Sequence, residues 1–235
     1  MTHASREELR AELLASIPPW YSPLAHLALP ALAGLALAAL ALLRIRDLRL
    51  WQVALVPVFF AFGNAVEWHA HRGLLHRRTR FLQLLYLRHT PQHHALYVSD
   101  AMAVRSSREF RFILLPGYGI LAILAASSPL VVLFFAIGQP NLAALWVASA
   151  VVYLIAYEWL HLAYHLPESS SIGRLPLIQR LRRHHQLHHV PQLMQRWNFN
   201  VTVPLWDHLR GTVYSRSLAR PAPAPVAAAS SPPKE

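Results

Sequence analysis

Histidines gather in four boxes along this chain. The sequence has 15 histidines in 235 residues, and ten of them fall into these boxes. Neutral imidazole is the commonest nitrogen ligand for zinc, iron and copper, and ten imidazoles can fill two coordination spheres without a carboxylate or a thiolate. The pattern therefore predicts a site for two metal ions. The ten residues are His71, His76, His89, His93, His94, His161, His165, His185, His188 and His189.

The third and fourth boxes have the spacing of helical ligands. His161 and His165 are four residues apart, so on a helix both rings lie on one face and can reach one metal. The triplet of His185, His188 and His189 shares a face in the same way and can serve two neighbouring metals. Beside it, His184 points elsewhere, and we expect it to support the ligands or to take no part.

The first box is less regular. His71 and His76 are five residues apart, roughly 140° around an ideal helix of about 3.6 residues per turn. Either the helix is distorted or the two rings bind different metals. His69 aligns better with His76, so it competes with His71 as the ligand.

The second box follows a helix-start signal. Thr90-Pro91 reads as an N-cap followed by proline at the first helical position. We therefore expect His89 to lie just outside a helix that carries His93 and His94.

Carboxylates near the boxes are candidates to orient the ligands. Glu67 lies four residues before His71, and Glu158 lies three before His161. A carboxylate so placed can accept the N–H of the ring nitrogen that faces away from the metal. A plain charge at the membrane interface is an equally good interpretation of both glutamates. Asp207 is predicted to share the supporting role.

Composition indicates a membrane protein without its own electron carrier. Hydrophobic residues make up 54% of the chain, charged residues only 14%, and the mean hydropathy is +0.29, which favours several membrane spans. There is no cysteine, which excludes iron–sulfur clusters, thiolate-bound haem and disulfides. Glycine-rich nucleotide loops are also absent. Electrons for any redox chemistry must therefore come from another protein.

Four apolar runs are long enough, or nearly so, to cross a bilayer. The second run is short and contains Pro57, so a re-entrant path for it stays open. The second and fourth runs lead directly into histidine boxes, which places the metal site at a membrane surface. The runs are 24–43, 50–66, 112–138 and 142–163.

Arginine is concentrated around the boxes. Of the 22 basic residues 21 are arginine, and the segments 68–111 and 166–220 each carry eight arginines against two acidic residues. Positive charge beside spans marks the cytoplasmic side, although a cluster at residues 44–49 would then lie outside. Membrane topology explains the net charge of +11 better than nucleic acid does, so no nucleic-acid partner is expected. Alanine- and arginine-rich usage suggests a bacterial inner membrane.

Three regions are predicted. Residues 1–23 form an amphipathic N-terminal segment, residues 24–219 form the membrane-embedded domain, and residues 220–235 form a disordered tail rich in proline and alanine. His3, His26 and His208 have no expected function.

The ordered motifs resemble those of the fatty acid hydroxylase and sterol desaturase superfamily of membrane di-iron enzymes. The resemblance covers about residues 50–215 and includes the closing segment 204–212. It implies an all-α integral membrane bundle of about four transmembrane helices, with a helical cytosolic cap that holds a dinuclear site on the ten histidines. In the second box three residues separate His89 from the histidine pair, whereas the lipid 2-hydroxylase branch has two, which weakens any transfer of its substrate.

The resemblance also implies an activity. We expect two iron ions, with zinc as a substitute in purified protein, and O2 as co-substrate for oxidation of an unactivated C–H bond of a membrane lipid such as a fatty acyl chain. Hydroxylation is favoured, and desaturation on the same site is the alternative. The expected electron donor is a ferredoxin- or cytochrome-b5-type protein with its reductase. A histidine-rich zinc transporter or metal-binding protein is the alternative from another class, but scarce carboxylates and ligands at span ends disfavour it.

Overall fold

The computed structural model describes residues 2–80 and 82–215, so the predicted tail at 220–235 lies outside the described residues. Within them every regular element is helical, and β pairing is limited to an isolated bridge between Val98 and Ala101. The predicted all-α class is confirmed. The elements are α1 (His3–Ala15), α2 (Pro23–Leu42), α3 (Leu50–Val53), α4 (Val56–Ala70), a π-helix (His71–Leu75), α5 (Gln83–Arg88), a second π-helix (His89–His93), α6 (His94–Leu96), a 3-10 helix (Ser107–Phe112), α7 (Gly117–Ala136), α8 (Pro140–Tyr164), α9 (Pro176–His188) and α10 (Leu205–Leu209).

Four helical stretches are long and apolar enough to cross a membrane. They are Pro23–Leu42, Leu50–Leu75, Ser107–Ala136 and Pro140–Tyr164, in agreement with the four predicted runs. Large apolar side chains remain exposed along them, as expected of surfaces that face lipid rather than water.

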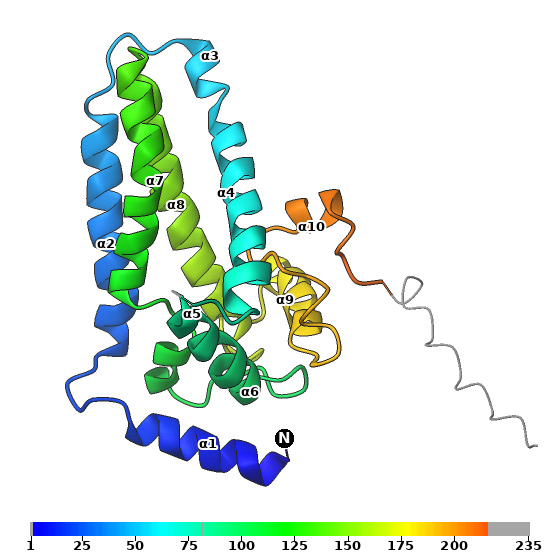
Figure 1. Ribbon diagram of the computed structural model, residues 1–235. Coiled ribbons are helices and arrows are strands. Elements are labelled where there is room, and N and C mark those ends of the chain that lie inside the picture. The colour runs from blue at the N-terminus through cyan, green and yellow to red at the C-terminus, as the bar shows by residue number, and fades with distance from the viewer. Residues whose placement is uncertain (1, 81, 216–235) are drawn as a thin grey trace, which may run out of the picture.

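The four stretches stand side by side above a helical cap (Figure 1). The central member is α8, which contacts α2, α4 and α7. The second run forms α3 and α4, which together lead from the far end of the bundle down to the cap. This run extends along the bundle, so the structure gives no support to a re-entrant path.

Glycines allow two spans to approach α8 closely. A methyl group on Gly34 of α2 would lie 3.0 Å from Cγ1 of Val151, and one on Gly63 of α4 would lie 3.0 Å from the ring of Tyr153. Ordinary contacts between carbon atoms are about 3.5–4.0 Å, so larger residues would push the helices apart. Small residues at such crossings are the usual means by which spans associate.

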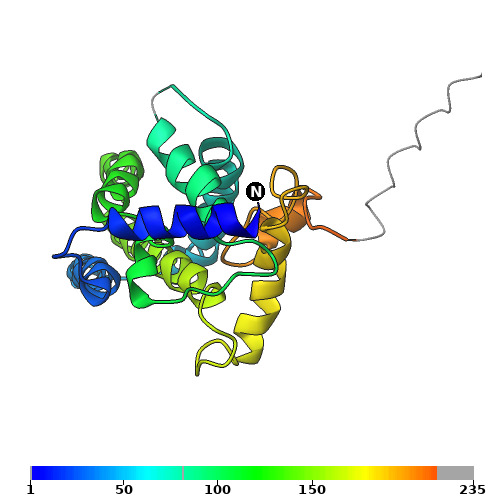
Figure 2. The same cartoon turned by 90° about the horizontal axis from the view of Figure 1, so that it is seen from below.

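The N-terminal segment is part of the cap. Seen from below, α1 lies across the cap (Figure 2). Its Leu9 and Leu13 pack on a buried cluster that includes Leu96, and the Arg10 guanidinium donates to Oε2 of Glu109 at 2.5 Å. The predicted boundary of the membrane-embedded domain at residue 23 stays a prediction, and the one at residue 219 lies outside the described residues.

The loop between α2 and α3 closes the other end of the bundle. Asn141 at the start of α8 accepts the N–H of Arg46 at 3.1 Å and donates to its carbonyl at 2.6 Å. The loop between α2 and α3, which carries Arg44, Arg46 and Arg49, lies at the end of the bundle opposite the cap (Figure 1). Arginines therefore flank the spans at both ends.

Candidate metal centre

The ten box histidines come together in two groups of five, and all ten are buried. Within each group the five candidate ligand nitrogens lie within 4.8 Å of one another. The first histidine group is His71, His76, His89, His94 and His188. The second histidine group is His93, His161, His165, His185 and His189.

Two π-helical turns build the first histidine group. The pairs His71/His76 and His89/His94 are each five residues apart, and the π-helices begin at His71 and at His89. Hydrogen bonds from i to i+5 widen the turn, so residues five apart come to lie on one side. The rings of His71 and His76 stack with centroids 5.0 Å apart, and Nε2 of His89 lies 3.0 Å from Nε2 of His94. Of the two predicted alternatives, the structure shows the distorted helix.

The prediction that a helix begins at Thr90-Pro91 is wrong. Helix α5 continues through the second π-helix into α6. Proline has no N–H to donate, and a π turn accommodates it by shifting the hydrogen-bond frame. The Thr90 hydroxyl donates to the Leu75 carbonyl at 2.7 Å, which ties the second box to the first.

The last two boxes behave as their spacing predicts. His161 and His165, at the end of α8, both join the second group, while α9 sends His185 and His189 to the second group and His188 to the first. One helix thus serves both groups. His69 is exposed against the Trp68 ring and belongs to neither group, so the structure favours His71 in that competition.

Backbone carbonyls fix the tautomers of the rings. A carbonyl can only accept, so a ring nitrogen that contacts one must carry the proton, and the other nitrogen keeps its lone pair. The ring Nδ1 atoms of five histidines have such partners: His71 with Phe199, His93 with Phe112, His165 with Met102, His188 with Trp197 and His189 with Tyr97.

Lone pairs consequently face one another inside each group. In the first, Nε2 of His188 lies 2.9 Å from Nε2 of His76. The Thr90 hydroxyl has already given its proton to Leu75, so it accepts from Nδ1 of His76 at 3.3 Å, and His76 also points a lone pair inward.

The second group has the same arrangement. Nε2 of His165 and Nε2 of His189 lie 3.3 Å and 3.0 Å from Nε2 of His185, and one ring proton cannot satisfy both. Converging lone pairs repel unless a cation lies between them. The donor set and its tautomers therefore fit a metal ion in each group.

Burial keeps these imidazoles neutral, as metal ligands must be. Loss of solvation is the largest cause in every case, and neighbouring histidines add to it. The pKa is lowered for the eight histidines outside the spans, which are His76, His89, His93, His94, His165, His185, His188 and His189.

Asp207 organises the segment that holds the first group. Its carboxylate accepts the backbone N–H groups of Phe199 and Asn200 at 3.0 and 2.8 Å, and Nε2 of His184 at 3.0 Å. Burial opposes ionisation of Asp207, but the hydrogen bonds from His184, Thr212 and Asn200 outweigh it and lower the pKa. The connection between Asp207 and the first group is therefore indirect, through Phe199, whose carbonyl contacts His71.

A left-handed residue shapes the same segment. Asn198 has φ of 58°, a conformation that asparagine tolerates better than most residues. Its side chain donates to the His184 carbonyl at 2.9 Å and accepts the N–H of Tyr214 at 2.7 Å. This bend lets the carbonyls on both sides, of Trp197 and Phe199, reach His188 and His71.

Glu67 has partners other than the predicted His71 ring. Its carboxylate accepts the N–H groups of Val201 and Thr202 and the hydroxyls of Thr202 and Tyr153. These four bonds occupy both oxygens, and Nδ1 of His71 bonds to Phe199 instead. Glu67 therefore fixes residues 201 and 202, just before the closing segment, rather than a histidine ring.

A buried ion pair supports the second group. Oε2 of Glu109 accepts from Arg10 at 2.5 Å and from the Tyr97 hydroxyl at 2.9 Å. The carbonyl of Tyr97 in turn accepts Nδ1 of His189. Sequence reasoning missed Arg10 and Glu109, because 99 residues separate them and no local pattern joins them.

Glu158 also lacks its predicted contact with His161. Its Oε2 accepts the N–H of Leu115 at 2.8 Å, and its Oε1 is buried without a hydrogen-bond partner. Through Leu115 the carboxyl group contacts the segment before α7, and Glu158 is one of the residues that line a pocket. Of the three histidines with no expected function, His26 does have partners, the Tyr21 hydroxyl and the Leu115 carbonyl.

The chain matches a known protein family. The model of the fatty acid hydroxylase family matches residues 56–212, which contain both histidine groups. This match confirms the resemblance seen in the motifs. Neither the curated proteins nor the solved structures include a match to this chain.

Proposed function

Because the chain belongs to the fatty acid hydroxylase family, we propose that it hydroxylates an unactivated C–H bond of a membrane lipid with two iron ions and O2. The observation that carries the proposal is the pair of histidine groups, whose inward lone pairs lie at the ends of apolar spans. The four-span bundle and the family agree on a membrane protein that acts on lipid.

Two irons in such a donor set would supply reductive activation of O2. In the overall reaction one oxygen atom enters the C–H bond, the other leaves as water, and two electrons and two protons are consumed. Imidazole nitrogen suits iron, although zinc can compete for the same site because its intrinsic affinity is higher.

The protein's own part is to position donors and to exclude water. The carbonyls of Phe199, Trp197, Tyr97, Met102 and Phe112 hold the rings at the tautomer that binds metal. All ten histidines are buried, which shields a reactive centre from solvent and from side reactions. Oriented rings need no rearrangement when metal binds.

The electrons would come from an acidic carrier of the ferredoxin or cytochrome-b5 type with its reductase. Exposed arginines of the cap, among them Arg77, Arg78, Arg183 and Arg196, give it a basic face that attracts such a protein. The same charge favours a cytoplasmic cap in a bacterial inner membrane.

The experiment is a comparison of lipids from cells with and without the gene, joined to metal analysis of the purified chain. A +16 mass change and about two irons per chain support hydroxylation, and a change of −2 would replace it with desaturation. An unchanged lipidome from cells that make a metal-loaded chain would refute both, and altered zinc uptake would then favour the transporter.

A further inference from the structure

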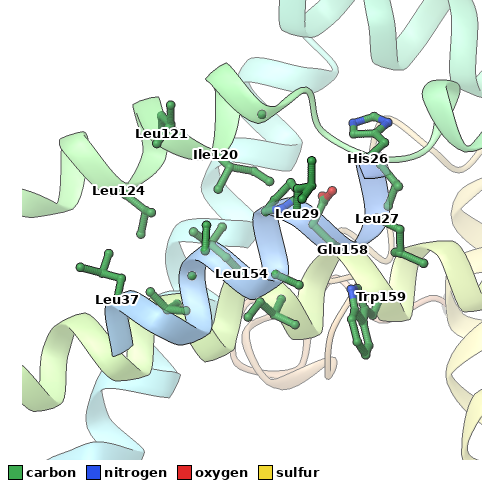
Figure 3. Close-up of a pocket in the computed structure, with 18 residues that line it drawn as sticks. His26, Leu27, Leu29, Leu37, Ile120, Leu121, Leu124, Leu154, Glu158 and Trp159 are labelled. Carbon is green, nitrogen blue, oxygen red and sulfur yellow. The ribbon is translucent and has the colours of Figure 1, made fainter. Parts of the chain in front are cut away.

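An apolar pocket lies among α2, α7 and α8 at the cap end of the spans. It encloses about 330 Å3 and is lined by side chains such as Leu29, Leu121, Leu124 and Leu154. Figure 3 shows these side chains converging from the three helices. The volume lies within the range of ligand pockets, roughly 300–1,000 Å3. Its walls belong to membrane-spanning helices, so the ligands that can reach it are lipids.

One buried polar atom in the pocket lacks a partner. Oε2 of Glu158 accepts the Leu115 N–H, but Oε1 has no hydrogen-bond partner although it is buried. Figure 3 shows this carboxyl group among the side chains that line the pocket. Buried polar atoms are nearly always paired, so the free oxygen points to a ligand group.

His26, also in the pocket wall, is already committed. Nε2 of His26 donates to the Leu115 carbonyl at 3.0 Å, which leaves Nδ1 to accept the Tyr21 hydroxyl at 2.9 Å. Both ring nitrogens are therefore used, and among the described residues that line the pocket Oε1 of Glu158 is the buried side-chain atom without a hydrogen-bond partner.

The chemistry of a carboxyl group selects the ligand. A hydroxyl both donates and accepts, so it can bond to Glu158 whether that side chain is ionised or protonated. An anionic headgroup would need a cation, and none of the described residues that line the pocket is lysine or arginine. Burying the charge of an anionic headgroup in this pocket without a cation beside it is costly. The pocket therefore favours an uncharged lipid with a hydroxyl group.

A short chain segment connects the pocket to the second histidine group. Leu114 lines the pocket and Leu115 bonds to Glu158, while the Phe112 carbonyl just before them accepts Nδ1 of His93. On α8, Glu158 precedes His161 by three residues, about 4.5 Å along the axis. The polar end of the pocket is thus its end nearest the candidate metal site.

We propose that the pocket binds the lipid substrate through a hydroxyl group hydrogen-bonded to Glu158, with the apolar chain between α2 and α7. This proposal rests on the proposed function and narrows its substrate to uncharged, hydroxyl-bearing lipids. Carbons near the hydroxyl then lie closest to the second histidine group, so oxidation is expected in the half of the chain that carries it.

The test is photolabelling of the full-length, iron-loaded protein in nanodiscs. The probe is a hexadecanol with a diazirine on its chain, and mass spectrometry maps the labelled peptides. We expect labels on α2, α7 and α8, and we expect unlabelled hexadecanol to compete about tenfold better than its methyl ether or palmitate. Glu158→Leu should abolish that preference, whereas Glu158→Gln, which still donates and accepts, should keep it.

A matched pair of leucines on α2 tests the position. Leu29 is 63% exposed and lines the pocket, while Leu32 is 62% exposed and does not. Leu29→Trp should fill the pocket and reduce labelling about tenfold, and Leu32→Trp should leave it unchanged. Iron content and elution in size exclusion verify that each variant is folded.

The outcomes separate the two proposals. Labelling that ignores both Leu29→Trp and Glu158→Leu, or a methyl ether that competes as well as the alcohol, would overturn the pocket. Undiminished lipid oxidation by folded Leu29→Trp would overturn the pocket and leave the function standing. Pocket labelling in an iron-loaded, electron-supplied chain that oxidises no lipid would overturn the function and, with it, the role of the pocket as a substrate site.

Discussion

The two histidine groups are held by different parts of the chain in the same manner. The first is held by residues 197–212, in which Asp207 accepts five hydrogen bonds. Glu67 of α4 accepts four, three of them from Val201 and Thr202 of this segment. The second is held by residues 97–115, which contain Glu109 and bond to Glu158 of α8. Each of these two carboxylates keeps one oxygen unpartnered. In both regions the carboxylates hold carbonyl-bearing segments, and the carbonyls hold the ligands.

The difference lies in how fully the carboxylates of each region are bonded, since Nε1 of Trp206 and Nδ1 of His94 on the side of the first group are also buried without a partner. Carboxylates with every oxygen paired in a buried site make a rigid support. Around the second group two carboxylate oxygens have no hydrogen-bond partner, and one of them belongs to Glu158, which lines the apolar pocket. We infer that the first group is the structural anchor and that the second lies where substrate arrives.

Loss of a ligand should have the largest effect, and it should be equal on the two sides. His188→Ala removes a donor from the first group and His161→Ala one from the second. Each should lower activity by more than about 100-fold, since even partners of ligands are worth 10–100-fold. Turnover and iron content measure this, with the exposed His3→Ala as control. Full activity in either variant would remove that residue from the site.

Acid should act on both groups together. Burial lowers the pKa of four off-span histidines in each group, so below pH 6.5 the unfolded chain binds more protons than the metal-free folded chain. Stability should fall as the pH drops through 6.5, by about 1.4 kcal/mol per histidine for each unit of pKa depression. Thermal unfolding of metal-free protein over a pH series measures this loss of stability. Two separate acid transitions would show that the two histidine groups do not respond to acid together.

The ion pair tests the support of the second group. Arg10→Ala leaves Glu109 buried without its cation and should cost about 3–5 kcal/mol of unfolding free energy. The exposed pair of Arg105 and Glu7 provides the control, because Arg105→Ala should change the Tm little. Denaturant unfolding measures the free energy of unfolding of both variants. Equal losses of that free energy would mean that the buried pair has no special role.

Asp207→Asn should give the smallest and most local effect. The amide keeps the size of the carboxylate but turns an N–H group toward donors, which loosens the segment that carries Phe199. Metal affinity should fall about 10–100-fold in the first group and less in the second. Competition with a chelator measures the affinity for each of the two ions. An equal loss of affinity for both would contradict the idea that the two histidine groups are supported by separate parts of the chain.

Much of the site could be predicted because box spacing is a local property. All ten box histidines lie in the two groups, and the His-x4-His spacing of the first box had given a distorted helix as one of two alternatives. The partners of Glu67 and Glu158 could not be predicted. They lie 134 and 43 residues away, and which carbonyl meets which ring depends on tertiary packing. The prediction that a helix begins at Thr90-Pro91 was wrong because the helix continues through this point as a π turn, which accommodates the proline.

The reliance on main-chain carbonyls has a consequence for how this site can change over time. A backbone oxygen is present whatever side chain the residue carries, so Met102, Phe112 and Trp197 can be exchanged for other residues without removing the groups that orient His165, His93 and His188. Mutational tolerance should thus be high at these positions and low at Asp207 and Glu109. The groups that orient the histidine rings therefore depend more on the backbone conformation than on the side chains of these residues.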